Sequence, residues 1–199
     1  MKNRVTRTCV LLLAALLAGC STLMAPSTPP SSTPVAPYRD AIALSGRMAV
    51  NYQKDGRNES LSGKFNWQQS ANRTDVSLAS PLGQTIALIE VTPDAARLTQ
   101  GNQPARVAAD IDALSAQALG WHLPVSGLRH WLQGYALSAD GTRFRASPEN
   151  NNVTTRDGWR LHFVSWQDDA ASVPQPKRID AERSTGDQVA LRIVIDGQP

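Results

Sequence analysis

The residues with the most specific chemistry lie near the start of the chain, where Leu-Ala-Gly is followed by Cys20. This is the pattern of a bacterial lipobox, in which the signal peptide is cut before the cysteine and the thiol carries a diacylglyceryl thioether. A basic stretch and eight apolar residues, Val10 to Leu17, precede it, too few to span a bilayer, which takes about 20. We therefore expect residues 1–19 to be a lipoprotein signal peptide and lipidated Cys20 to anchor the mature chain. The alternative is an ordinary secretion signal with a chance cysteine.

The mature chain has no other sulfur chemistry and no excess charge. The second cysteine, Cys9, leaves with the signal peptide, so we expect no disulfide, thiol nucleophile or cysteine metal site. Three of the 20 Lys and Arg residues leave with it, and the remaining cations equal the 17 Asp and Glu in number. The net charge therefore gives no argument for a nucleic-acid partner or for binding to anionic lipid headgroups.

Catalytic patterns are absent from the sequence, which has neither a nucleophile elbow nor a phosphate-binding loop. His122, His130 and His162 do not have the spacing of metal ligands, and a surface or capping role explains each of them. We therefore expect no catalytic residues, no metal site and no cofactor, and nothing indicates an enzyme.

A short loop is the other feature with functional meaning. Ser80-Pro81-Leu82-Gly83 fits a type I turn, because Ser, Pro and Gly stand where this turn prefers them. Leu82 then lies near the tip, where a polar residue is usual. Turn chemistry alone favours a leucine that folds back onto the sheet. The alternative is an exposed hydrophobic finger that touches a membrane or a lipid chain.

The segment after the cysteine has the composition of a tether. Ser21 to Pro37 contains five Pro, four Ser and three Thr, which is typical of an extended chain without a core. It would reach on the order of 50 Å, at about 3.1 Å per residue. We expect residues 20–37 to form the lipidated tether and residues 38–199 to form one folded domain.

Alternation of apolar and polar residues, typical of β-strands, dominates this domain. It is clearest in the first strand, Ile42 to Tyr52, and in the last, Gln188 to Asp196. Gln53 to Asn58 is the expected hairpin after the first strand. Further strands are expected at residues 61–68, 76–78, 85–91 (apolar on both faces), 95–99, 105–107, 143–147, 153–156, 159–167 and 177–182.

A helical insert, residues 110–134, interrupts the strands. Asp110 is expected to cap a helix that ends before Gly120, and a second helix is expected from Pro124 to Gly134. This order of elements predicts an α+β fold: a strongly curved antiparallel sheet, or incomplete β-barrel, with a helical lid. Alternation does not distinguish a solid core from a cavity under the lid. Five tryptophans among 11 aromatic residues favour a ligand site only weakly.

Several segments together resemble the LolB family of outer-membrane lipoprotein receptors. The likeness covers most of the mature chain, and it depends on the order and spacing of the segments together with the lipobox. The segments are Leu44–Val50, Gly63–Gln69, Ser80–Thr85, Leu119–Val125 and Leu128–Gly134.

The resemblance implies an incomplete antiparallel barrel, covered by helices, around an apolar cavity for acyl chains. It makes residues 110–134 the lid and Pro81, Leu82 and Gly83 the protruding membrane-insertion loop, which reverses the interpretation that turn chemistry favours for Leu82. The candidates for the cavity lining are Met48, Val50, Phe65, Trp67, Leu78, Ile86, Leu88, Ile111, Leu114, Leu128, Trp131 and Leu132.

The resemblance also implies a function in which the protein accepts acylated lipoproteins from a soluble periplasmic carrier. It would insert them into the inner leaflet of the outer membrane without ATP. The expected protein is a monomer, lipid-anchored on the periplasmic face of the outer membrane, with no nucleic-acid partner. Ser21 stands where an aspartate would be the usual signal for retention in the inner membrane. The alternatives are a structural or assembly lipoprotein with a solid core and, further off, an envelope hydrolase.

Overall fold

A long hairpin forms the centre of the molecule. Strands β1 (Ile42–Lys54) and β2 (Arg57–Gln69) pair along their whole length, and the two residues between them, Asp55 and Gly56, have φ angles of 50° and 73°. Two successive positive φ angles are the mark of a type I′ turn, whose twist matches that of the strands. The computed structural model describes residues 30–168, 171–184 and 188–197. The signal peptide, Cys20 and the first part of the expected tether lie outside these ranges.

The other strands extend this hairpin on both sides into one antiparallel sheet. Within the described ranges the strand order is β6-β5-β4-β3-β2-β1-β12-β11-β10-β9, and β6 and β9 do not pair, so the sheet is not closed into a barrel. A separate hairpin joins β7 (Tyr135–Leu137) to β8 (Arg143–Arg145). The remaining strands are β3 (Thr74–Ala79), β4 (Thr85–Val91), β5 (Ala96–Gln100), β6 (Arg106–Ala108), β9 (Asn152–Thr154), β10 (Arg160–Trp166), β11 (Pro176–Arg183) and β12 (Val189–Ile195).

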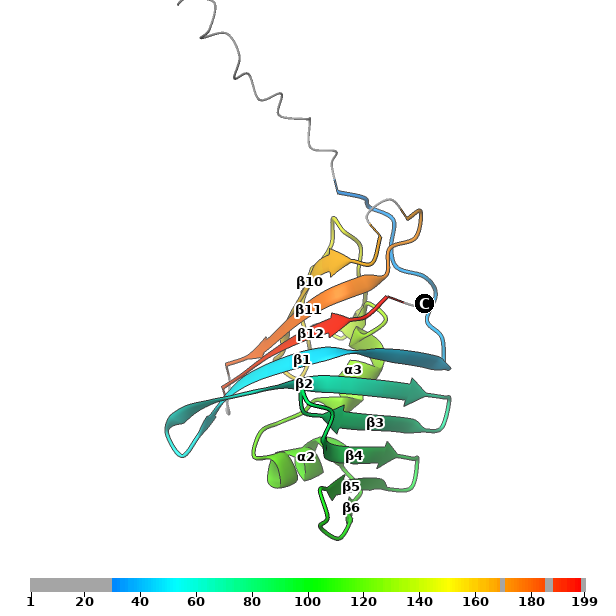
Figure 1. The fold of residues 1–199 in the computed structure, drawn as a ribbon. Coiled ribbons are helices and arrows are strands. Elements are labelled where there is room, and N and C mark those ends of the chain that lie inside the picture. The colour runs from blue at the N-terminus through cyan, green and yellow to red at the C-terminus, as the bar shows by residue number, and fades with distance from the viewer. Residues whose placement is uncertain (1–29, 169–170, 185–187, 198–199) are drawn as a thin grey trace, which may run out of the picture.

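Two helices, α2 (Ile111–Leu119) and α3 (Val125–Trp131), lie against one face of the sheet, behind it in the view of Figure 1. The core lies between this face and the helices, because alternate residues of each strand point inward there. Neither helix is long and apolar enough to cross a bilayer. The expected curved antiparallel sheet with a helical pair on one face is therefore confirmed. Strand β7 was not expected from the sequence.

The tryptophans are part of this core. All five are buried, with exposed fractions between 1% for Trp67 and 9% for Trp166. Trp131 and Trp159 meet edge to face, with ring centroids 5.6 Å apart. Burying large rings in edge-to-face contacts stabilises the fold. The richness in tryptophan is thus explained by packing, without a ligand.

The folded part of the chain begins earlier than the composition indicates. We expected a tether up to Pro37, but Val35 is only 1% exposed and its amide donates to the carbonyl of Ala146 at 2.9 Å. The amide of Glu149 donates to the carbonyl of Ser31 at 3.1 Å. Residues 31–37, which we call the strap, therefore lie on the domain, because one buried valine and backbone hydrogen bonds fix an otherwise polar segment.

Candidate functional site

Helix α2 begins and ends as its sequence predicts. The carboxylate of Asp110 accepts hydrogen bonds from the amides of Asp112 at 2.8 Å and Ala113 at 3.1 Å, which satisfies two free donors of the first turn. Gly120 follows the helix with φ of 80°, in the left-handed region that suits glycine. The helix turns Ile111 and Leu114 into the core.

Polar contacts join α2 to α3, so that the two helices form one lid. The backbone amide of Ser126 donates to Asp112 Oδ1 at 3.1 Å, and the Ser126 hydroxyl donates to Oδ2 of the same carboxylate. The hydroxyl of Ser115, which is fully buried, donates to the carbonyl and accepts from the amide of Leu123 in the connection between the helices. The expected second helix is shorter than predicted, because it ends at Trp131 instead of Gly134.

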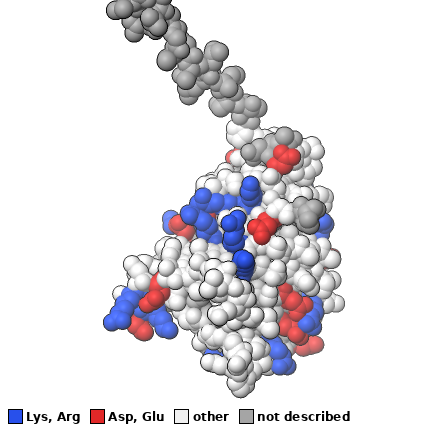
Figure 2. All heavy atoms as spheres, viewed as in Figure 1, with Lys and Arg blue, Asp and Glu red and all other residues white. Residues whose placement is uncertain are grey.

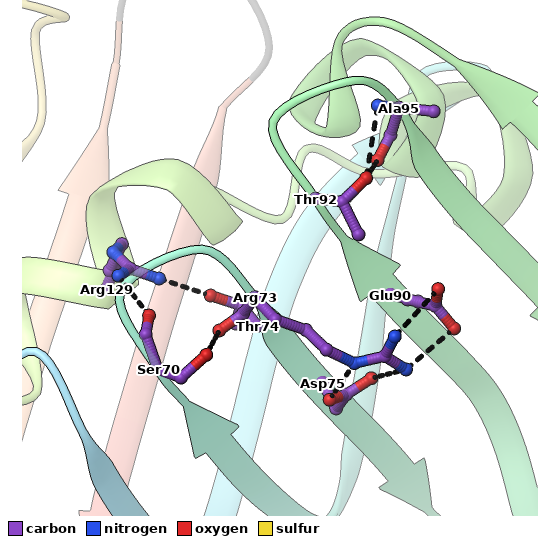
Figure 3. Close-up of polar contacts among 8 residues, drawn as sticks. All are labelled: Ser70, Arg73, Thr74, Asp75, Glu90, Thr92, Ala95 and Arg129. Atoms are coloured by element: carbon purple, nitrogen blue, oxygen red, sulfur yellow. Dashed lines mark hydrogen bonds and ion pairs between the residues drawn. The ribbon is translucent and has the colours of Figure 1, made fainter.

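An arginine of α3 forms hydrogen bonds between this lid and the sheet. Figure 3 shows Arg129 of α3 directed at the turn between β2 and β3, where its guanidinium donates to the hydroxyl of Thr74 at 2.7 Å and to the carbonyls of Ser70 and Ala71. The strands below are held independently, since Arg73 binds both Asp75 and Glu90 across β3 and β4. These ion pairs lie on the exposed surface beside the lid contact.

An apolar cavity of about 20 Å³ lies between the central strands and the end of the lid. This is room for about one water molecule. The side chains that line it come from β1, β2, β3 and β4 and from the region where α2 ends. They are Met48, Val50, Leu61, Leu78, Ile86, Leu119 and Trp121, with Gly63, Lys64 and Ala79 beside them.

The expected lining residues are distributed over this cavity and the core. Met48, Val50, Leu78 and Ile86 line the cavity. The others lie in the closed core, with exposed fractions of 6% or less; they are Phe65, Trp67, Ile111, Leu114, Leu128, Trp131 and Leu132. Sequence reasoning missed Leu61, Leu119 and Trp121, although Trp121 and Leu119 belong to the segment that carries the family likeness.

Leu88 is the exception, and its expected inward position is wrong. It is 50% exposed, whereas its neighbours Ala87 and Ile89 are buried, so it points out of the sheet. Simple alternation would place Ile86 on the same outer face. A register shift between β3 and β4 leaves Ile86 without a partner, as in a β-bulge, and turns its side chain inward, beside Gly63.

The loop between β3 and β4 is a turn with its leucine in solvent. The amide of Gly83 donates to the carbonyl of Ser80 at 2.9 Å, which is the bond of the expected turn, and the amide of Gln84 donates to the Ser80 hydroxyl at 3.2 Å. Leu82 is 90% exposed, the largest exposed fraction among the exposed large hydrophobic residues of the described ranges. A leucine folded back onto the sheet is therefore excluded. The loop starts directly after Ala79, which borders the cavity.

Titratable groups near the lid give no sign of acid–base chemistry. Partial burial, with the positive charge of Arg129 as a smaller cause, lowers the pKa of His130 below its usual 6.5, and its ring stacks on Tyr38 with centroids 5.3 Å apart. No group of three or more His, Cys, Asp or Glu side chains gathers into a possible metal site in the ranges that the structure describes. The site is therefore a small apolar cavity, a lid and an exposed apolar loop.

Comparison with known proteins identifies the family. The family model described as "Outer membrane lipoprotein LolB" matches residues 40–197, which is nearly the whole folded domain. The chain belongs to the LolB family. The family that the sequence segments resemble is thereby confirmed, and with it the lipid-anchored location at the outer membrane.

Several bacterial proteins named outer-membrane lipoprotein LolB are similar to this chain over most of their length. The outer-membrane lipoprotein LolB of Cupriavidus necator is 40% identical over 76% of this chain and 77% of its own. That of Cupriavidus taiwanensis is 36% identical over 98% of both chains, and that of Thiobacillus denitrificans is 35% identical over 92% of both. A DUF1329 family protein from Desulfovibrio piger, at 9% identity and a TM-score of 0.41, covers 79% of this chain and 85% of that one, a likeness too low to support any inference.

Proposed function

We propose that this LolB family protein is a receptor that takes acylated lipoproteins from a soluble periplasmic carrier and inserts them into the inner leaflet of the outer membrane. The observation that carries the proposal is the succession of an apolar cavity, a strand end and an exposed leucine within a few residues of chain. Leu78 and Ala79 border the cavity, and Leu82 stands in solvent three residues later. An acyl chain that leaves the cavity would pass directly along this loop.

Transfer by direct contact follows from the energetics of an acyl chain in water. Exposing one chain of 16 carbons costs on the order of 12 kcal/mol, at about 0.8 kcal/mol per CH₂ group. A lipoprotein therefore cannot cross the periplasm unprotected, and each step needs an apolar site that receives the chain before the previous one releases it. If the chain is bound more tightly in the bilayer than in the receptor, insertion runs downhill without ATP.

The receptor must open to take this cargo. A cavity of about 20 Å³ holds no acyl chain, so the helical lid has to move away from the sheet. The contacts suit such a movement, because the Asp112–Ser126 hydrogen bonds keep the two helices together while Arg129 provides the main polar attachment to the β2–β3 turn. In the proposal the lid moves as one piece, and the apolar core residues, among them Phe65 and Trp67 of β2, become the lining.

The test separates receipt from release. The mature chain with Cys20→Ala, which cannot be anchored by lipid, is mixed with carrier that holds a labelled lipoprotein and with liposomes. The label is then followed from the carrier to the receptor and the bilayer. We expect Leu82→Glu to take cargo from the carrier at the normal rate but to retain it, because a charged tip does not enter the bilayer. Val107→Glu is the control, since Val107 is also exposed, at 56%, and lies on β6. Release by the Leu82→Glu variant at the normal rate would contradict the proposed role of the loop.

The alternative of a structural or assembly lipoprotein is favoured by one observation, the small volume of the apolar cavity beneath the lid, about 20 Å³. In that case no variant would alter the movement of cargo, and the chain would take no label from the carrier at all. The two functions are thus separated by the first step of the same experiment.

A further inference from the structure

Basic side chains gather on the face of the sheet opposite the lid. Lys64 of β2 pairs with Arg47 of β1, Arg47 pairs with Val194 of β12, and Val194 pairs with Arg178 of β11. Residues directly opposite each other in a sheet point to the same face, so three cations stand in one row across four strands. Arg192 is a fourth cation on this face. It lies two residues before Val194 on β12 and pairs with Ala49 of β1. Figure 2 shows a group of Lys and Arg side chains on this face, over β11, β12 and β1.

The acidic residues of this face do not balance the cations. Asp180 lies between Arg178, at 2.6 Å, and Arg192, at 3.1 Å, and Asp196 lies 3.9 Å from Arg47. Two carboxylates thus stand among four cations, which leaves two positive charges in excess. Arg178 and Arg192 share one carboxylate, and Lys64 forms no ion pair with a described residue. The side chain of Arg47 is 69% exposed, so it can reach a partner outside the molecule. The positive charge is local, because the mature chain as a whole is neutral.

The same face includes the base of the exposed loop. An open groove of about 330 Å³ is lined by Arg47, Lys64 and Arg192 together with apolar groups from three strands and with Pro81 of the loop. Leu82, the residue after Pro81, is 90% exposed. In Figure 1 the link between β3 and β4 crosses this side of β2. The apolar tip and the cations therefore belong to one continuous surface, which we call the basic face.

We propose that the basic face binds the headgroups of anionic phospholipids in the membrane that Leu82 enters. An apolar residue that enters a bilayer, beside cations that reach the phosphate layer, is the arrangement by which peripheral proteins attach to anionic membranes. The membrane is favoured over a protein partner because the loop stands on the same surface. A carrier docked on this face would keep the bilayer away from Leu82. The inference rests on the proposed function, and it adds the orientation of the receptor and a preference among lipids.

The magnitude of the effect follows from the charges. Each Lys or Arg close to an anionic surface strengthens binding about fivefold at physiological ionic strength. Neutralising Arg47 and Lys64 together should therefore weaken binding to anionic vesicles at least about tenfold. Neither side chain is buried, so the double substitution should leave folding unchanged.

Co-sedimentation with vesicles tests the inference on the mature chain with Cys20→Ala. One set of vesicles contains phosphatidylcholine alone, and in the other part of it is replaced by phosphatidylglycerol. We expect tighter binding to the second set, a loss of this difference in high salt, and the same loss in Arg47→Gln/Lys64→Gln. The matched control is Arg97→Gln/Arg143→Gln, which removes two exposed arginines from β5 and β8, outside the basic face, and should bind as the unmodified chain does.

Other outcomes would overturn the inference. If the Arg47→Gln/Lys64→Gln variant binds phosphatidylglycerol vesicles as tightly as the control does, the basic face does not contact lipid. If its vesicle binding is unchanged but it takes cargo from the carrier more slowly, the face docks a protein. The proposed function is tested separately. If it is wrong, Leu82→Glu releases cargo at the normal rate, whatever the lipid composition of the vesicles.

Discussion

The guanidinium of Arg129 lies 2.7 Å from the hydroxyl oxygen of Thr74, and this hydrogen bond joins the helical lid to the sheet. Thr74 is buried, with an exposed fraction of 4%, and its hydrogen bond with Arg129 is partly buried. The same guanidinium donates to the backbone carbonyls of Ser70 and Ala71. In the described ranges, no other side chain of α3 forms a hydrogen bond to the strands β1 to β6 or their turns. Arg129 is therefore the main polar attachment of α3.

We expect Arg129→Met to weaken the lid while keeping most of the apolar stem of the side chain. Hydrogen bonds from a charged donor contribute about 1.5–3 kcal/mol each, and Thr74 would lose its partner. The free energy of unfolding should fall by about 2–3 kcal/mol in urea titrations, and the amides of α3 should exchange hydrogen faster. Arg143→Met, at an exposed position on β8, is the control. Unchanged stability and exchange would mean that apolar packing alone holds the lid.

We expect the stability of the chain to depend weakly on pH through His130, which is exposed at one edge of α3. Partial burial lowers its pKa below 6.5, and Arg129 next to it acts in the same direction. As the pH falls below 6.5, the unfolded chain binds a proton that the folded chain still excludes, so the free energy of unfolding decreases. The decrease stops below the lowered pKa, where both states are protonated. Unfolding in urea above and below pH 6.5 should therefore show a smaller pH dependence for His130→Gln than for the unmodified chain. An identical dependence would contradict this role.

The strap contributes to stability although its composition is that of a linker. Val35 packs against Gly134, where even a Cβ atom would lie 2.7 Å from the valine Cγ1. Its carbonyl also accepts from Arg145 Nε at 2.8 Å. We expect Val35→Ala to lower the free energy of unfolding by about 1.5 kcal/mol, at about 0.8 kcal/mol per buried carbon, and a chain that starts at residue 38 to lose more. Val173→Ala, at a position that is 42% exposed, should change little in the same urea titration. Equal effects of the two substitutions would show that the strap is not held by this contact.

Local rules were sufficient for much of the fold. The cap at Asp110, the turn after Ser80 and the inward residues of β1 depend on neighbours a few positions away, and the sequence predicts all of them. The burial of Val35 depends instead on Gly134 and Ala146, about one hundred residues later, and composition contains no sign of this pairing. The same holds for the basic face, whose cations come from four strands and are invisible in a net charge of zero.

Two features of the site needed the three-dimensional structure for other reasons. The opposite orientations of Ile86 and Leu88 follow from a register shift between β3 and β4, which depends on how the strands pair and not on the residues of β4 alone. The volume under the lid depends on how closely the helices approach the sheet, and alternation carries no information on distance. The sequence therefore identified most of the apolar residues beneath the lid without showing that they leave only about 20 Å³.

Ile86 and Leu88 offer a direct test of the cavity, because they are two apolar residues of one strand on opposite faces. We expect Ile86→Trp to fill the space beneath the lid and to weaken the binding of a fluorescent fatty acid at least about tenfold. The indole ring takes the place of part of the acyl chain, and the loss of that apolar contact costs more than about 1.4 kcal/mol of binding free energy. Leu88→Trp adds the same ring on the outer face and should bind the probe normally. Thermal unfolding of both variants separates a filled cavity from a disrupted core, because overpacking costs about 1–3 kcal/mol in stability. Normal probe binding by a folded Ile86→Trp variant would place the acyl chain elsewhere. Failure of the unmodified chain to bind the probe would favour the solid core of an assembly lipoprotein.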